Sequence, residues 1–135
     1  MKKYVGIWLD HVKSNIISVS QKEELFSVIE SHIENHRGEA AIRQSPSSHL
    51  LDAALEGKTQ EKRKQILHRY YQEIIKNVKS AEKLLIFGPG EAKIELEKEI
   101  LKCKDFAPHL TVEPADRMSN SQISAKVRKF FRPYL

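Results

Sequence analysis

The sequence predicts an α/β fold: a ribonuclease H-like mixed five-stranded sheet, made of a three-strand antiparallel meander and two crossover units, and flanked by helices. Three observations favour it. Short segments with alternating apolar residues fill the first 33 positions. A long segment of helical period follows, and after it an apolar run stops at Gly88-Pro89-Gly90. Because crossovers between parallel strands are right-handed, we expect the last two strands to lie parallel beside the first.

The meander is expected to contain three strands joined by short turns. In the first strand, odd-numbered residues such as Ile7 face one side of the sheet, and even-numbered residues such as Trp8 face the other. The connection Asp10–Lys13 is short enough to form a tight hairpin. The predicted strands are Tyr4–Leu9, Lys13–Ser20 and Leu25–Ile33.

The segment 36–58 loses all periodicity and contains glycines, a proline and a cluster of serines. A long irregular loop is therefore expected there, with a short helical turn around His49–Leu55 as one alternative. The helix after it, Thr59–Val78, carries a clear apolar stripe. Ser119 and Gln122 have the spacing of a capping box that opens the last helix. The other predicted elements are a strand at Leu84–Phe87, a helix at Glu91–Cys103 and a strand at His109–Glu113.

The composition is that of one globular domain, expected to span residues 1–135. A chain of 135 residues can bury a core of its own, and 40% hydrophobic with 30% charged residues is ordinary. The single cysteine, Cys103, cannot form an intrachain disulfide. No apolar run approaches the roughly 20 residues that a membrane helix needs. These features predict a cytoplasmic protein with no membrane partner.

The turn after the fourth strand could bind an anion. Gly88 and Gly90 permit positive φ angles, a helix N-terminus follows directly, and Lys93 lies close by. The turn lacks the longer glycine pattern of a phosphate-binding loop, and Glu91 would repel a phosphate. A tight structural turn is therefore the alternative to an anion site at Gly88, Gly90 and Lys93.

The sequence offers no complete catalytic or metal site. A two-metal nuclease needs several converging carboxylates. Asp10, at the end of the first strand, could supply one, but the fourth strand ends in Gly88 where a second is required. A hairpin-turn carboxylate explains Asp10 better. Because His11, His32 and His36 lack a regular metal-binding spacing, we expect no catalytic residue, no metal and no cofactor.

Basic residues concentrate in the long loop and at the start of the helix that follows it. The net charge is +5, and seven Lys or Arg residues accompany four acids between positions 37 and 69. Such a cluster can neutralise the phosphates of structured RNA without reading its sequence. A solvated helix start is the alternative. The predicted RNA-contacting residues are Arg37, Arg43, Lys58, Lys62, Arg63, Lys64 and Arg69.

Four short segments together resemble a known family: Ile7–His11, His68–Tyr71, Gly88–Lys93 and Glu113–Met118. Over nearly its whole length, the sequence is similar to small bacterial proteins related to the middle domain of eukaryotic and archaeal class-1 peptide release factors and of Pelota. Some of these relatives are labelled host-attachment proteins. The resemblance implies the ribonuclease H-like fold and a place at the ribosome.

One departure from the family shapes the functional hypothesis. In the release factors, a Gly-Gly-Gln motif in the long loop promotes peptidyl-tRNA hydrolysis, and no Gly-Gly-Gln occurs anywhere in this chain. The loop holds only Gly38 and Gly57, far apart, with Gln44 between them. Pelota, which also lacks the motif, is the closer analogy. The hypothesis is a non-enzymatic, translation-associated protein that binds the ribosome, ribosomal RNA or tRNA through its basic loop and helix.

Two alternatives stay open at this point. One is an enzyme, either a peptidyl-tRNA hydrolase that uses Gln44 in a variant loop or a metal-dependent nuclease centred on Asp10. The other is a protein-interaction module or a homodimer, with the sheet edge or the long loop as its interface.

Overall fold

The computed structural model of the chain describes residues 3–33 and 49–135. Nine helices and strands are assigned within these two ranges. Their order is β1 (Lys3–Leu9), β2 (Lys13–Val19), β3 (Glu24–Glu30), α2 (His49–Val78), β4 (Ala81–Gly88), α3 (Ala92–Leu101), β5 (His109–Pro114), α4 (Asn120–Phe131) and the short 3₁₀ helix η1 (Arg132–Tyr134).

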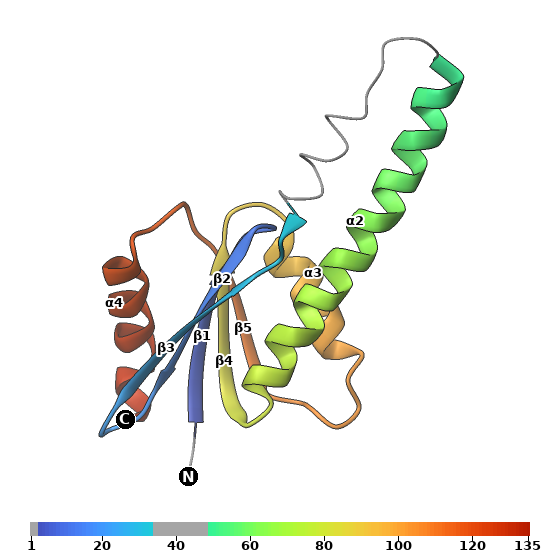
Figure 1. Cartoon of the computed structure of the whole chain (residues 1–135). Helices are drawn as coiled ribbons and strands as arrows, with labels where there is room; N and C mark the ends of the chain where they lie inside the picture. Colours follow the sequence, from blue (N-terminus) through green and yellow to red (C-terminus); the bar gives the residue numbers. More distant parts are fainter. Residues whose placement is uncertain (1–2, 34–48) are drawn as a thin grey trace.

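The five strands form one mixed sheet in the order β3-β2-β1-β4-β5 (Figure 1). Strand β1 pairs antiparallel with β2, and β2 pairs antiparallel with β3. Strands β1, β4 and β5 run parallel to one another. Helices α2 and α3 cover one face, and α4 covers the other. The predicted ribonuclease H-like mixed sheet is thus confirmed.

The core is divided in two by the sheet, because both faces of the central strands are buried. In β1, the odd-numbered residues such as Ile7 belong to the cluster under α2 and α3, whereas Tyr4 and Trp8 belong to the cluster under α4. Strand β4 alternates in the same way, with Ile86 on the first side and Phe87 on the second. The predicted alternation in the first strand is confirmed.

Helix α4 approaches the sheet closely because β1 carries a glycine beneath it. A Cβ atom at Gly6 would lie 2.3 Å from Cγ2 of Val127, well inside van der Waals contact. The helix begins with the predicted capping box. The Ser119 side chain accepts from the Gln122 N–H, and the Gln122 side chain accepts from the Ser119 N–H. Phe131 is fully buried at the other end.

Helix α2 begins at His49, ten residues before the predicted start at Thr59. The predicted irregular loop at 36–58 is therefore wrong for residues 49–58; positions 34–48 lie outside the described residues. Gly57 was the misleading signal, although a glycine inside a helix costs only about 1 kcal/mol relative to alanine. The leucines and alanines before it are good helix formers and offset that cost.

Strand β3 ends at Glu30 rather than at the predicted Ile33. Two residues explain the early end. The Ser31 hydroxyl donates a hydrogen bond to the carbonyl oxygen of His11 at 2.6 Å, and His32 adopts a positive φ of 63°. Leu25 is 57% exposed although it lies on the same face of β3 as the buried Ile29, because β3 lies at the edge of the sheet.

Candidate nucleic-acid interface

Helix α2 is much longer than the sheet on which it packs. Its 30 residues span about 45 Å at 1.5 Å per residue. The strands contain six to eight residues and span about 20–26 Å. The N-terminal part of α2 therefore extends past the end of the sheet (Figure 1). We call residues 49–65 the arm, because the first buried side chain of α2 among the described ones is that of Leu67.

Beyond the arm, α2 is fixed firmly to the sheet. Tyr70, Ile74 and Val78 are each at most 1% exposed and belong to the core cluster shared with α3. This confirms the predicted apolar stripe. The arm therefore continues from a buried part of α2, residues 67–78, which we call the base.

Several predicted RNA-contacting residues lie together on α2. Lys62, Lys64 and Arg69 are exposed, and Arg63 is half-buried. Lys62 and Arg69 are seven residues apart, about two helical turns, so they share the outer face. Arg63 and Lys64 follow at about 100° per residue and lie around the side. The cations therefore surround the helix instead of forming one flat patch.

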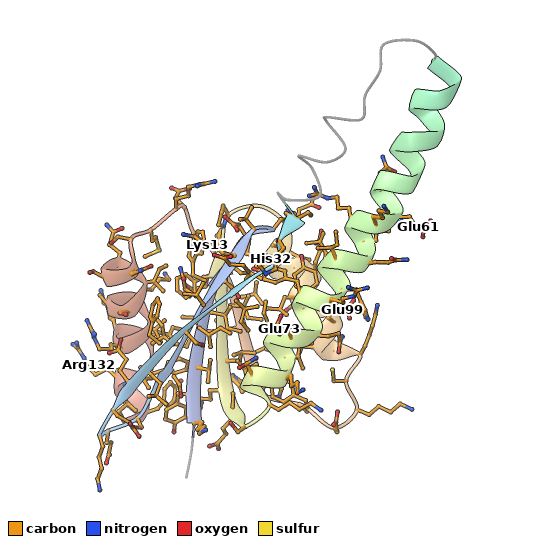
Figure 2. All side chains as sticks on the ribbon, viewed as in Figure 1. Lys13, His32, Glu61, Glu73, Glu99 and Arg132 are labelled. Carbon is orange, nitrogen blue, oxygen red and sulfur yellow. The ribbon has the colours of Figure 1, made fainter. Side chains whose placement is uncertain are left out.

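Acidic residues are interspersed with these cations. Figure 2 shows Glu61 on the arm and Glu73 farther along α2. The ion pairs found among the described side chains involve other bases, such as Lys79 with Asp105 at 2.9 Å, and none of the four α2 cations. Within that part of the chain, the four positive charges are available to a polyanion.

Three other predicted site residues lie wholly or partly outside the described residues. Arg37 and Arg43 lie outside the described residues, and the Lys58 side chain does too, although its backbone is helical. Their place relative to Lys62 stays a prediction.

A polar network that the sequence did not reveal joins the base of the arm to the sheet. The Tyr71 hydroxyl donates to Oε1 of Glu95 on α3 at 2.6 Å. Nε2 of His11, just after β1, lies 3.1 Å from the same oxygen. The Tyr70 hydroxyl donates to the carbonyl of Asp10 at 3.0 Å. These bonds connect α2, α3 and the end of β1.

Both tyrosines in this network are held in the neutral form. Burial, followed by the hydrogen bond to the Glu95 carboxylate, raises the pKa of Tyr71 far above its ordinary value. Burial likewise raises the pKa of Tyr70. The positive charge of Arg63 acts in the opposite direction and lowers the pKa of Tyr71 slightly. The network therefore consists of stable hydrogen-bond donors that fix the position of α2.

A second acidic residue of α3, Glu99, extends the contact between the two helices (Figure 2). Its Oε2 accepts from the Gln72 side chain at 3.1 Å and lies 3.5 Å from Nδ1 of His68. Lys102 approaches its other oxygen at 3.9 Å. The outer surface between α2 and α3 is therefore polar and closed by hydrogen bonds.

The Gly88-Pro89-Gly90 turn has the geometry of a structural connection. Gly88 has a φ of 151°, and a Cβ atom there would lie 2.2 Å from the carbonyl oxygen of Leu9. The Lys93 ammonium group donates to the carbonyl of Gly90, within the turn itself. Glu91 occupies the N-cap position of α3. This arrangement supports the turn alternative, and the anion site stays a prediction.

Asp10 is the hairpin-turn carboxylate that the sequence indicates. Its Oδ1 accepts from the N–H groups of Val12 and Lys13, at 2.8 and 2.9 Å. In residues 3–33 and 49–135, no group of three or more His, Cys, Asp or Glu side chains is arranged to hold a metal ion. Over the same ranges, no helix combines the length and apolar character that crossing a bilayer requires.

Comparison with known proteins identifies the fold. No protein-family profile and no curated protein matches the sequence. Among solved structures, the Pelota protein of Thermoplasma acidophilum matches with a TM-score of 0.57 and 14% identity, over 97% of this chain and 32% of Pelota. The archaeal translation termination factor aRF1 matches with a TM-score of 0.50 and 12% identity, over 94% of this chain and 34% of aRF1. The chain thus shares its fold with about a third of each of these proteins.

Proposed function

We propose that this protein is a non-enzymatic, translation-associated factor that binds the ribosome or a structured RNA through the arm and the adjoining outer face of α2. The observation that carries the proposal is the group of exposed cations, Lys62, Lys64 and Arg69, on a helix that extends past the sheet. The fold shared with Pelota and aRF1 supports a translation-related role.

The chemistry of such an interface is phosphate neutralisation. Lysine and arginine side chains spread around a helix can contact phosphates on both sides of a groove without reading bases. Each phosphate contact releases about 0.7–0.9 of a counterion, so binding weakens steeply as salt concentration rises. The buried base of α2 and the Tyr71–Glu95 hydrogen bond hold the arm in one direction, which lowers the entropy lost on binding.

The tripeptide Gly-Gly-Gln does not occur in this sequence, which supports a role in binding instead of peptidyl-tRNA hydrolysis. Gln44, the residue that the hydrolase alternative requires, lies outside the described residues. Release of peptide from peptidyl-tRNA by the purified protein, lost on Gln44→Ala, would replace the proposal with that alternative.

The proposal is tested by sedimentation with ribosomes and by fluorescence anisotropy with a structured RNA. The variant K62E/K64E should lower affinity at least about tenfold and reduce the slope of log affinity against log salt by about 1–2. The matched control is K104E/K129E, which makes the same charge change at exposed positions outside α2. Equal losses in the two variants, or no binding by the wild type at low salt, would contradict the proposal.

A further inference from the structure

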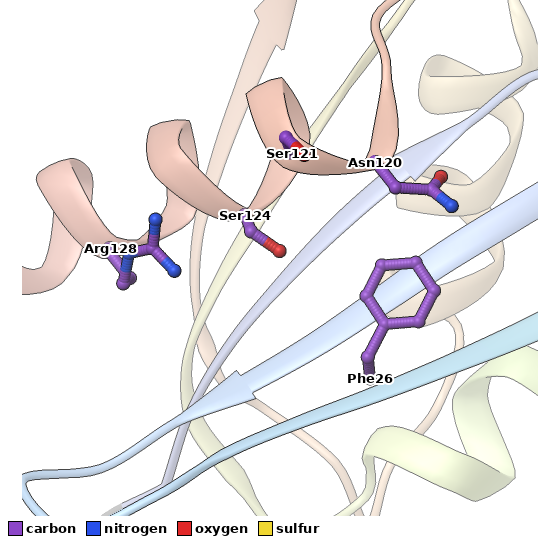
Figure 3. A pocket seen from close by; sticks show the side chains of 5 residues that line it. All are labelled: Phe26, Asn120, Ser121, Ser124 and Arg128. Atoms are coloured by element: carbon purple, nitrogen blue, oxygen red, sulfur yellow. The ribbon is translucent and has the colours of Figure 1, made fainter.

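Edge strand β3 has the features of a strand that takes a partner. Three of its seven residues are large, apolar and exposed: Leu25 at 57%, Phe26 at 43% and Val28 at 46%. Phe26 also forms one side of a shallow groove of about 350 Å³ beneath α4, lined by Asn120, Ser121, Ser124 and Arg128 (Figure 3). Among the described residues, β2 is the one strand that pairs with it.

Three of the usual protections of a sheet edge, lysine, proline and a bulge, are absent from β3, and its two charged residues, Glu24 and Glu30, lie at its ends. Natural edge strands carry lysine, proline or a bulge that discourages pairing with another chain. Glu24–Glu30 contains neither lysine nor proline, and its pairing with β2 runs without a register shift. The opposite edge strand, β5, ends in Pro114. The edge formed by β5 therefore carries a proline, and the edge formed by β3 does not.

The backbone groups that β3 offers can be assigned. The Ile29 carbonyl accepts from the Ser14 hydroxyl of β2, and the Ser31 N–H donates to the carbonyl of Val12. Ile29 and Ser31 therefore direct their backbone groups toward β2. Because these directions alternate along a strand, the N–H and C=O groups of Phe26 and Val28 point away from β2.

We propose that this edge pairs with β3 of a second copy of the chain, antiparallel and centred on Phe26. In that register the two Phe26 side chains face each other across the two-fold axis, next to the groove under α4. Lys22, in the turn just before β3, then lies near Glu30 of the second copy, and by symmetry this approach of opposite charges occurs twice. Both residues are exposed. Aromatic pairs and opposite charges directly across two strands are both favourable.

The charges along the strand select this register over its neighbours. Centring the pair on Ser27 would place Glu24 opposite Glu30 of the second copy, twice, which is repulsive. Centring it on Val28 would place Phe26 opposite Glu30 of the second copy, so the aromatic pair at the axis would be lost. A contact centred on Phe26 uses one edge of each copy and so closes after two copies, giving a dimer with a continuous ten-stranded sheet.

The test is sedimentation velocity and light scattering of the full chain from about 1 µM to about 500 µM. The wild type should show a concentration-dependent dimer. Phe26→Lys should abolish it, because two ammonium groups would then meet at the axis. Leu101→Lys, the same change at a 70% exposed leucine distant from β3, should leave it intact.

A charge swap tests the register. K22E alone places two carboxylates opposite each other, and E30K alone places two ammonium groups opposite each other. Each should weaken dimerisation about tenfold, and the double variant K22E/E30K should restore it. The proposal is overturned by a monomer at every concentration, by higher aggregates in place of the dimer, by equal behaviour of Phe26→Lys and Leu101→Lys, or by a double variant that stays weak.

Discussion

The Tyr71 hydroxyl and the Glu95 carboxylate lie 2.6 Å apart, and this bond joins the base of the arm to α3. Tyr71→Phe removes the donor while keeping the ring. We expect the free energy of unfolding to fall by about 1 kcal/mol in chemical denaturation near neutral pH. Tyr134→Phe, at a half-exposed tyrosine elsewhere, is the control and should have little effect.

Tyr70 and Tyr71 predict how the stability of the protein depends on alkaline pH. Their folded pKa values are raised above the ordinary 10.0, so their contribution to stability is fully present below pH 10.0 and is lost as pH rises above it. Each should decrease the free energy of unfolding by up to about 1.4 kcal/mol per pH unit in that range. Denaturation of the wild type and of Tyr71→Phe from about pH 9 to about pH 11 measures this. Identical slopes for the two proteins would show that Tyr71 ionises as easily folded as unfolded.

The contact between Gly6 and Val127 should make β1 intolerant of any side chain at position 6. Gly6→Ala places a methyl group 2.3 Å from Cγ2 of Val127, and we expect a loss of about 2–3 kcal/mol in the free energy of unfolding. Val127→Ala should recover part of this loss in the double variant. Gly90→Ala is the comparison: φ is +66° but no atom lies within 4 Å, so only backbone strain of about 1–2 kcal/mol is expected.

The capping box of α4 predicts that two serine-to-alanine variants will differ in stability. Ser119→Ala removes the side-chain oxygen that accepts from the Gln122 N–H, and should lower the free energy of unfolding by about 1 kcal/mol. Ser121→Ala makes the same chemical change two residues later, on an exposed side chain of the helix, and should change stability by no more than about 0.5 kcal/mol. A comparable loss in both would indicate that the cap contributes nothing specific.

The length of α2 predicts unequal hydrogen exchange along one helix. Amides from Leu67 to Val78 lie on the buried base and should exchange only through opening of the core. Amides of the arm at residues 60–65 should exchange at least about a hundredfold faster, because that part of α2 opens without disturbing the sheet. Uniform protection over the whole helix would mean that the arm is packed as firmly as the base.

Much of the fold could be predicted from the sequence, because alternation and helical period report directly on which side chains are buried. The two-sided burial of β1, the stripe on α2 and the Ser119 cap all follow from local pattern. The start of α2 did not, since Gly57 and the serines before it are typical of loops. The exposure of Leu25 depends on which strand lies at the sheet edge, and that is set by the tertiary structure.

The candidate site was harder to predict than the fold. Its cations were visible as a charge cluster, and four of them lie inside the predicted helix Thr59–Val78. That this helix begins at His49 and extends past the sheet could not be predicted from the local pattern. The Tyr71–Glu95–His11 network links residues up to 84 positions apart, and no local pattern indicates such contacts. The one local signal was that His11 lies two residues after the end of a buried strand.

The position of α2 relative to β3 has a consequence for the affinity of the proposed dimer for RNA. The proposed two-fold axis at Phe26 is perpendicular to the sheet, so both copies of α2 lie on the same face, and the antiparallel strands direct the two arms to opposite ends. An RNA long enough to reach both would bind bivalently, with the second contact made at high effective concentration. Phe26→Lys, which adds a positive charge far from the arm, would then weaken RNA binding by separating the two copies.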